Sequence, residues 1–154
     1  MAEMDSEISQ KLINTFMQFR KTGWHTKKIA GCNPSEFKLL IVIKKGMNEG
    51  TEAMKVSEIS QKLQVTPPTV TQLINVLEKD GLVERTIDPK DRRAVKIRLT
   101  EQGLEVTLKA KQAFRETFLG LIDHLGEEDS HKLAELLEKV NEYFLNESKR
   151  EGKA

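Results

Sequence analysis

The positions of the prolines limit this chain more than any other feature of its sequence. The 154-residue chain has four prolines, all between residues 34 and 89: Pro34, Pro67, Pro68 and Pro89. Proline breaks the interior of a helix because it lacks an N–H and its ring clashes with the preceding turn. Long helices can therefore form at the two ends of the chain, while the middle must consist of short elements.

Apolar residues at helical spacing predict long helices at both ends. In residues 5–28 they form the stripe of one helical face at Ile8, Leu12, Phe16 and Phe19. Gly23 weakens this helix near its end. A second long helix is expected from a cap at Thr100 to about His124, and a third after Gly126, where three acidic residues favour a helix start. The apolar stripe of this last helix is formed by Leu133, Leu136, Leu137, Val140 and Phe144.

The middle of the chain contains the signals of shorter helices. Asn33 to Glu36 combines a capping residue, a proline at the first helical position and a reciprocal glutamate, so a helix should start there and stop near Gly46. Residues 47–54 read as a polar loop. A short helix through Val56, Ile59 and Leu63 follows, and then a turn. Thr66 and Pro67 are the expected cap and first residue of a helix that runs to Lys79 and ends at Asp80-Gly81.

After Gly81 the apolar period changes from helical to alternating. Val95, Ile97 and Leu99 alternate with basic residues, which is typical of a half-buried strand. Asp88-Pro89-Lys90-Asp91 is a strong turn signal. Residues 82–99 are therefore predicted to form a hairpin with a charged tip, and the fold class is mainly α with a small β-hairpin wing beside a helix-turn-helix.

A helical wheel separates the two faces of the predicted helix at residues 67–79. Its buried face consists of Val70, Leu73, Ile74 and Leu77. The opposite face and its flanks carry Pro68, Thr69, Thr71, Gln72 and Asn75. Gln and Asn can pair bidentately with adenine, and Thr can contact a base edge, so this face fits base recognition. Taken alone, such polar residues fit a merely solvated surface equally well. We also expect the first amides of this helix to bind a phosphate.

The formal charge of +1 conceals an uneven distribution. Residues 82–99 hold six basic and three acidic residues, whereas residues 126–151 hold four basic and eight acidic ones. A charge run is usually only a solvated face, but this basic one lies on a hairpin beside a helix-turn-helix. We expect the hairpin to approach a polyanion and the acidic helix to face away from it.

Composition excludes several classes of protein. The longest apolar run is five residues, far short of the ~20 that a membrane-spanning helix needs. The acidic N-terminus is unlike a secretory signal, and a single cysteine fits a reducing cytoplasm. The sequence therefore predicts a cytoplasmic protein that does not associate with membranes.

Three motifs resemble the MarR family of transcription regulators, which is named for multiple antibiotic resistance. They are Val65-Thr66-Pro67-Pro68-Thr69-Val70-Thr71, Leu77-Glu78-Lys79-Asp80-Gly81-Leu82-Val83-Glu84-Arg85, and Asp91-Arg92-Arg93-Ala94 followed by Leu99-Thr100-Glu101-Gln102-Gly103. The resemblance covers nearly the whole chain, and Asp-x-Arg followed by Leu-Thr-x-x-Gly is its most specific part.

The resemblance implies a homodimer in which residues 1–32 and 100–154 supply the dimerisation helices and residues 33–99 form the DNA-binding domain. The helix at 67–79 would enter the major groove and the wing at 82–99 the adjacent minor groove. Two-fold symmetry predicts a palindromic site in double-stranded DNA, with recognition helices ~34 Å apart. The wing-tip arginine falls on Arg93 and its supporting aspartate on Asp91. Phosphate contacts are then expected from Arg92, Lys90 and Arg85.

Other candidate sites carry weaker signals. His25, His124 and His131 match no standard zinc spacing with Cys32, so we expect no metal and no cofactor. Cys32 lies in a loop, which leaves thiol sensing open as an alternative. Phe19, Trp24 and Phe37 would line the cleft in which relatives bind ligands, or they pack in the core. An effector, if one exists, would be a small aromatic or phenolic molecule.

No catalytic set emerges, because the serines lack suitably spaced His and acidic partners and no phosphate-binding glycine loop is present. The sequence predicts a homodimeric regulator, most simply a repressor, and not an enzyme. The alternatives are a winged-helix module that binds a protein, or a redox sensor that acts through Cys32.

Overall fold

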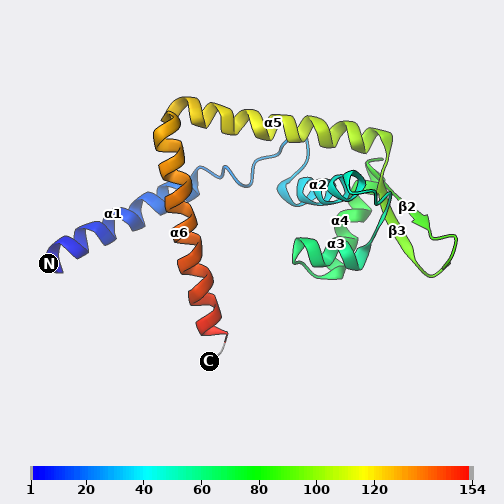
Figure 1. The fold of residues 1–154 in the computed structure, drawn as a ribbon, viewed down its shortest axis with the longest axis horizontal. Helices are drawn as coiled ribbons and strands as arrows, with labels where there is room; N and C mark the ends of the chain where they lie inside the picture. Colours follow the sequence, from blue (N-terminus) through cyan, green and yellow to red (C-terminus); the bar gives the residue numbers. More distant parts are fainter. Residues whose placement is uncertain (1, 153–154) are drawn as a thin grey trace. The chain divides into compact units, whose positions relative to one another are not determined.

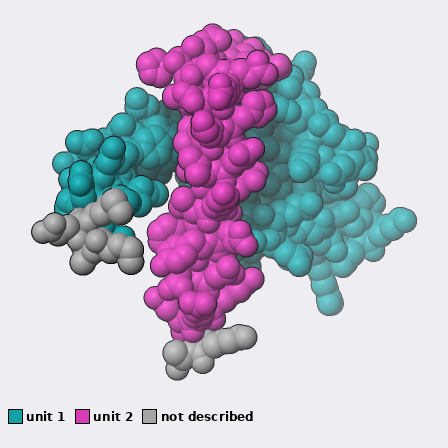
Figure 2. Space-filling view, turned by 60° about the vertical axis from the view of Figure 1, so that its left-hand side comes forward, with its two compact units in different colours: residues 1–111 teal, residues 112–154 magenta. Residues whose placement is uncertain are grey.

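The computed structural model describes residues 2–152. The chain divides into two compact units, Met1–Lys111 and Gln112–Ala154 (Figure 2). The first unit contains α1 (Ala2–Lys21), α2 (Pro34–Asn48), β1 (Met54–Lys55), α3 (Val56–Leu63), α4 (Pro67–Lys79), β2 (Val83–Ile87), β3 (Val95–Leu99) and the start of α5 (Glu101–Leu125). The second contains the rest of α5 and α6 (Glu127–Glu151). The predicted fold class is confirmed: the chain is mainly helical with a small antiparallel sheet (Figure 1).

Helix α1 ends earlier than the sequence predicts. It stops at Lys21 rather than at residue 28. Gly23 has a left-handed φ of +61°, and the N–H groups of Thr22 and Gly23 bond to the carbonyls of Phe19 and Arg20. The glycine therefore ends the helix, whereas the sequence predicts that it only weakens the helix.

The capping signals at α2 and α5 are confirmed. Asn33 Oδ1 accepts the N–H of Glu36 at 2.9 Å, and its amide nitrogen donates to the Glu36 carboxylate at 2.6 Å. Thr100 Oγ1 accepts the N–H of Gly103 at 2.9 Å and donates to the carbonyl of Gly81 at 2.6 Å. The second bond ties the start of α5 to the end of α4.

The expected stop of α2 at Gly46 and the loop at 47–54 are only partly right. The helix continues to Asn48, and Gly46 packs closely inside it: a Cβ there would lie 2.9 Å from the sulfur of Met54, which would have to shift. Met54 and Lys55 form the short strand β1, which pairs with β3 and gives the sheet order β1-β3-β2. A two-residue strand is too short to show an alternating pattern in the sequence. It forms because β3 provides its pairing partner.

The hydrophobic core lies within the first unit, between α2, α3, α4 and the sheet. The predicted inner face of α4 is confirmed: Val70, Ile74 and Leu77 are fully buried, and Leu73 packs partly buried against them. The same cluster contains Leu39, Leu40, Ile43, Ile59 and Ile97. This core fixes the orientation of α4, so that its opposite face points to solvent.

In the second unit, α6 buries none of its own side chains. Gly126, with φ of +86°, separates it from α5 as the sequence predicts. The apolar stripe remains exposed, and so does most of the apolar face of α1 in the first unit, including Leu12 and Phe16. Within residues 2–152, no helix is long and apolar enough to cross a membrane.

Candidate nucleic-acid interface

The outer face of α4 is the first part of the candidate site. All five residues predicted for base contact are exposed: Pro68, Thr69, Thr71, Gln72 and Asn75. The turn before the helix is fixed by Gln64, which is left-handed with φ of 56°, and by a hydrogen bond of 2.5 Å from Ser60 Oγ to the carbonyl of Val65. This turn connects α3 to α4, and α4 presents this face to solvent.

The N-terminus of α4 offers fewer free backbone N–H groups than the sequence predicts. Thr66 occupies the cap position, but its hydroxyl bonds to the Thr69 hydroxyl at 2.9 Å instead of capping a backbone N–H. Pro67 and Pro68 have no N–H, and the N–H of Val70 bonds to the carbonyl of Thr66. Among the described residues, the N–H groups of Thr66 and Thr69 are the two left at this helix start, fewer than the four that a helix without these prolines offers to a phosphate.

The wing tip between β2 and β3 is shaped by two aspartates. Asp88 Oδ1 accepts the N–H of Lys90 at 2.9 Å, and Asp91 Oδ1 accepts the N–H of Arg93 at 3.0 Å. The first of these bonds lowers the pKa of Asp88, and the nearby charge of Lys96 lowers it further. Asp91 therefore supports Arg93 through its backbone N–H, and among the described residues no ion pair joins their two side chains.

Ion pairs concentrate the free positive charge of the wing at its tip. On the strands, Lys96 lies 3.5 Å from Asp88, Arg98 pairs with Glu84, and Arg85 pairs with Glu78 of α4. Lys90, Arg92 and Arg93 at the tip are exposed, and among the described residues they have no ion-pair partner within 4 Å. Within the described part of the wing, the cations without an ion-pair partner therefore lie at the tip, and their contacts with DNA stay a prediction.

The side chain of Arg85, which is predicted to contact a phosphate, bonds to two residues of α4. Its guanidinium donates to Glu78 Oε1 at 2.5 Å and to Asn75 Oδ1 at 2.6 Å. Glu78 was not among the predicted site residues. Its signal in the sequence was its position three residues after Asn75, on the same side of α4.

Cys32 is buried, with 3% of its surface exposed. Burial raises the pKa of its thiol, and the negative charges of Glu36 and Asp80 raise it further. Both effects lower the fraction of reactive thiolate. The alternative of a redox sensor is therefore poorly supported by the geometry of this residue.

This burial predicts slow thiol chemistry. At pH 8, we expect Cys32 in the native protein to react with Ellman's reagent at least tenfold more slowly than in the urea-unfolded chain, because the reagent needs an accessible thiolate. The two rates are compared by stopped-flow absorbance, with glutathione at the same two urea concentrations as the control. Equal rates for native and unfolded protein would contradict the assignment of Cys32 as an inert core residue.

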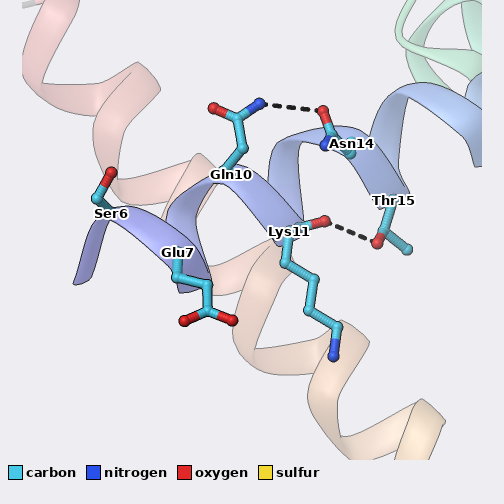
Figure 3. A pocket seen from close by; sticks show the side chains of 6 residues that line it. All are labelled: Ser6, Glu7, Gln10, Lys11, Asn14 and Thr15. Atoms are coloured by element: carbon cyan, nitrogen blue, oxygen red, sulfur yellow. Dashed lines mark hydrogen bonds between the residues drawn. The ribbon is translucent and has the colours of Figure 1, made fainter. Parts of the chain in front are cut away.

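The predicted ligand-cleft residues do not form one core cluster. Phe37 packs against the core, whereas Phe19 and Trp24 are exposed and stack with ring centroids 6.0 Å apart. The core-packing alternative thus holds for Phe37 only. A shallow pocket lies elsewhere, along one face of α1 (Figure 3), and is lined by Ser6, Glu7, Gln10, Lys11, Asn14 and Thr15. Its side chains bond along the helix, as from Gln10 to Asn14 at 3.1 Å, so it is a polar helix surface.

The region that holds this interface is similar to a known protein family. The model of the MarR family matches residues 33–95, from the cap of α2 to the start of β3. Residues 33–95 therefore form a MarR-family domain. It is 28% identical to the HTH-type transcriptional repressor MdtR of Bacillus subtilis, over 90% of this chain and 86% of MdtR.

A second MarR-type relative is the HTH-type transcriptional regulator PrsX of Escherichia coli, at 34% identity over 71% of this chain. The chain spans 63% of the length of PrsX. Among solved structures, a mutant of E. coli MarR in complex with operator DNA has a TM-score of 0.63 at 23% identity, covering 87% of this chain and 95% of that one. Both relatives are named as transcriptional regulators, and the chain has the winged helix-turn-helix fold of the MarR domain that its residues 33–95 match.

Proposed function

We propose that this protein is a homodimeric transcriptional repressor that binds palindromic double-stranded DNA. Helix α4 would lie in the major groove and the wing, residues 82–99, in the adjacent minor groove. The observation that carries the proposal is one compact unit with an exposed Thr, Gln and Asn face on α4 and three wing-tip cations that have no ion-pair partner among the described residues. The repressor MdtR supports it as a similar protein, and the operator complex of E. coli MarR supports it as a protein of the same fold.

Exposed apolar surface supports the homodimer. α6 buries none of its residues, although its stripe includes Leu136, Leu137 and Phe144, each more than half exposed. Full burial of each such side chain contributes about 1.5–3 kcal/mol of favourable free energy to association. α1 carries a comparable stripe. Residues 1–32 and 100–154 would therefore dimerise, and residues 33–99 would bind DNA.

The wing tip would act through charge and shape. Arg93 would enter the minor groove, where a narrow groove attracts a guanidinium. Asp91 would hold the turn that presents it, through the bond to the backbone of Arg93. Arg92 and Lys90 would contact phosphates, which sets the register of the protein on the duplex.

An effector would act on the same assembly. The stacked rings of Phe19 and Trp24, with Phe37 in the same unit, suit a small aromatic or phenolic molecule. Such a ligand relieves repression only if it binds the DNA-competent and DNA-incompetent states with different affinity. These two states would differ in the distance between the two recognition helices.

The test is DNA binding with and without Arg93. An operator is first selected from random duplex DNA, and fluorescence anisotropy then gives affinities from 50 to 300 mM salt. We expect Arg93→Ala to weaken binding at least tenfold and to reduce the slope of log affinity against log salt by about one, because one cationic contact is lost. Arg150→Ala on the acidic helix α6 is the matched control and should leave both quantities unchanged.

An Arg93→Ala protein that binds as tightly as the wild type would disprove the wing assignment. Wild-type protein that selects no duplex and shows no salt-dependent binding would instead support a winged-helix module that binds another protein.

A further inference from the structure

A hydrogen-bonded arginine connects the wing to the recognition face of α4. Arg85 lies on β2, three residues beyond the end of the α4-to-wing turn at Leu82, and its two terminal nitrogens reach different residues of α4. One donates to Asn75 Oδ1 at 2.6 Å and the other to Glu78 Oε1 at 2.5 Å. Because two bonds hold one planar group, the guanidinium is fixed in place beside the amide of Asn75.

This contact decides which way the Asn75 amide faces. A guanidinium has only N–H donors and no acceptor, so the amide must turn its oxygen toward Arg85. The oxygen and the nitrogen of an amide diverge from the same carbon. With Oδ1 directed at β2, only Nδ2 and its two donors can be directed at a base.

The bidentate contact expected of Asn75 is therefore altered. Pairing with adenine needs both amide atoms, Nδ2 donating to N7 and Oδ1 accepting from the N6 amino group. An amide that presents donors alone suits an edge that presents acceptors alone. Guanine, with O6 and N7 side by side in the major groove, is the base that offers this.

We infer that Arg85 is a positioning residue. It orients the Asn75 amide so that only the N–H donors of Nδ2 face the DNA, and Asn75 therefore selects guanine at one base pair of each half-site. The inference rests on the proposed function, in which α4 enters the major groove. It replaces the expectation that Arg85 itself contacts a phosphate. Arg85 would influence sequence preference without touching the DNA.

The experiment compares the duplexes selected from a random library by four variants and the wild type. Asn75→Ala identifies the base pair that Asn75 contacts. Gln72→Ala, which lacks any bond to Arg85 among the described residues, is the matched control and should change the preference at a different base pair while leaving that one unchanged. We expect guanine at the Asn75 position for the wild type. In Arg85→Ala, the preference for guanine over adenine there should fall about tenfold, the size of one base-edge contact, while the other positions keep their preferences.

Asn75→Asp keeps the bond to Arg85 and the shape of the side chain, so it tests the same idea without removing the arginine. Its second oxygen can only accept, and the preferred base should change to one that presents an amino group, cytosine or adenine. The added negative charge should also weaken binding to every duplex. Circular dichroism of each variant separates these effects from loss of fold.

Two results would overturn the inference while leaving the proposed function intact. One is adenine at the Asn75 position in the wild type. The other is an Arg85→Ala protein that loses affinity equally for all sequences with a smaller salt slope, which is the behaviour of a phosphate contact. If the wild type selects no duplex at all, the proposed function fails and the inference fails with it.

Discussion

Leu137→Glu is expected to convert the proposed dimer into a monomer and to weaken operator binding by about 10²–10⁴-fold. Leu137 lies at the centre of the α6 stripe and is 52% exposed in the single chain. A dimer that covers it would have to bury an unpaired carboxylate on each subunit, which costs several kcal/mol per copy. A monomer then contacts one half-site at a time and loses the effective concentration that links the two halves.

Analytical ultracentrifugation measures the oligomeric state, and anisotropy with a full operator measures the affinity. Asn146→Glu is the matched control, because it introduces the same charge on the opposite, exposed side of α6. It should remain dimeric and bind normally. The fold of the Leu137→Glu chain should be kept, since this leucine contributes to no buried cluster of its own subunit. A Leu137→Glu protein that stays dimeric would exclude α6 from the interface.

Gly103→Ala is expected to lower the free energy of unfolding by about 3 kcal/mol, at the upper end of the cost of overpacking. A Cβ at this position would lie 1.8 Å from the carbonyl oxygen of Leu82 and 2.7 Å from its carbon. That carbonyl cannot move aside freely, because it accepts the N–H of Thr100 at 3.1 Å. The close approach of α5 to the start of the hairpin therefore requires a residue without a side chain.

Gly120→Ala, on the same helix, is the control with the opposite sign. A Cβ there meets no atom within 4 Å, so replacing glycine should stabilise the helix by about 0.8–1 kcal/mol. Urea unfolding at one protomer concentration gives both values, since the stability of a dimer depends on concentration. If the two alanine variants were equally stable, the close contact between Gly103 and Leu82 would be refuted.

Local signals made much of the fold predictable. The cap at Asn33, the proline at the start of α4 and the glycines at 81 and 126 act within a few residues, so they mark helix ends without knowledge of the rest of the chain. The inner and outer faces of α4 follow from helical period alone. For the same reason, the exposure of the five residues predicted for base contact is confirmed, while the contacts themselves remain proposals.

Contacts between residues that are distant in the sequence could not be predicted from local patterns. Strand β1 exists because β3 offers it a partner at Ile97. Arg85 pairs with Glu78, seven residues earlier in the sequence on another element, and the number of charges in the wing does not predict this contact. Cys32 could be placed in a loop from its neighbours, but its burial depends on the core packed around that loop.

The amino-acid order by itself determined where helices start and stop, which face of α4 is apolar, and that positive charge gathers in the hairpin, because caps, periods and charge runs are local properties. The tertiary structure alone decided which cations stay free, how the Asn75 amide is turned and why Gly103 must be glycine. Those outcomes depend on atoms a few ångströms apart that belong to different elements, and packing of the core brings these atoms together.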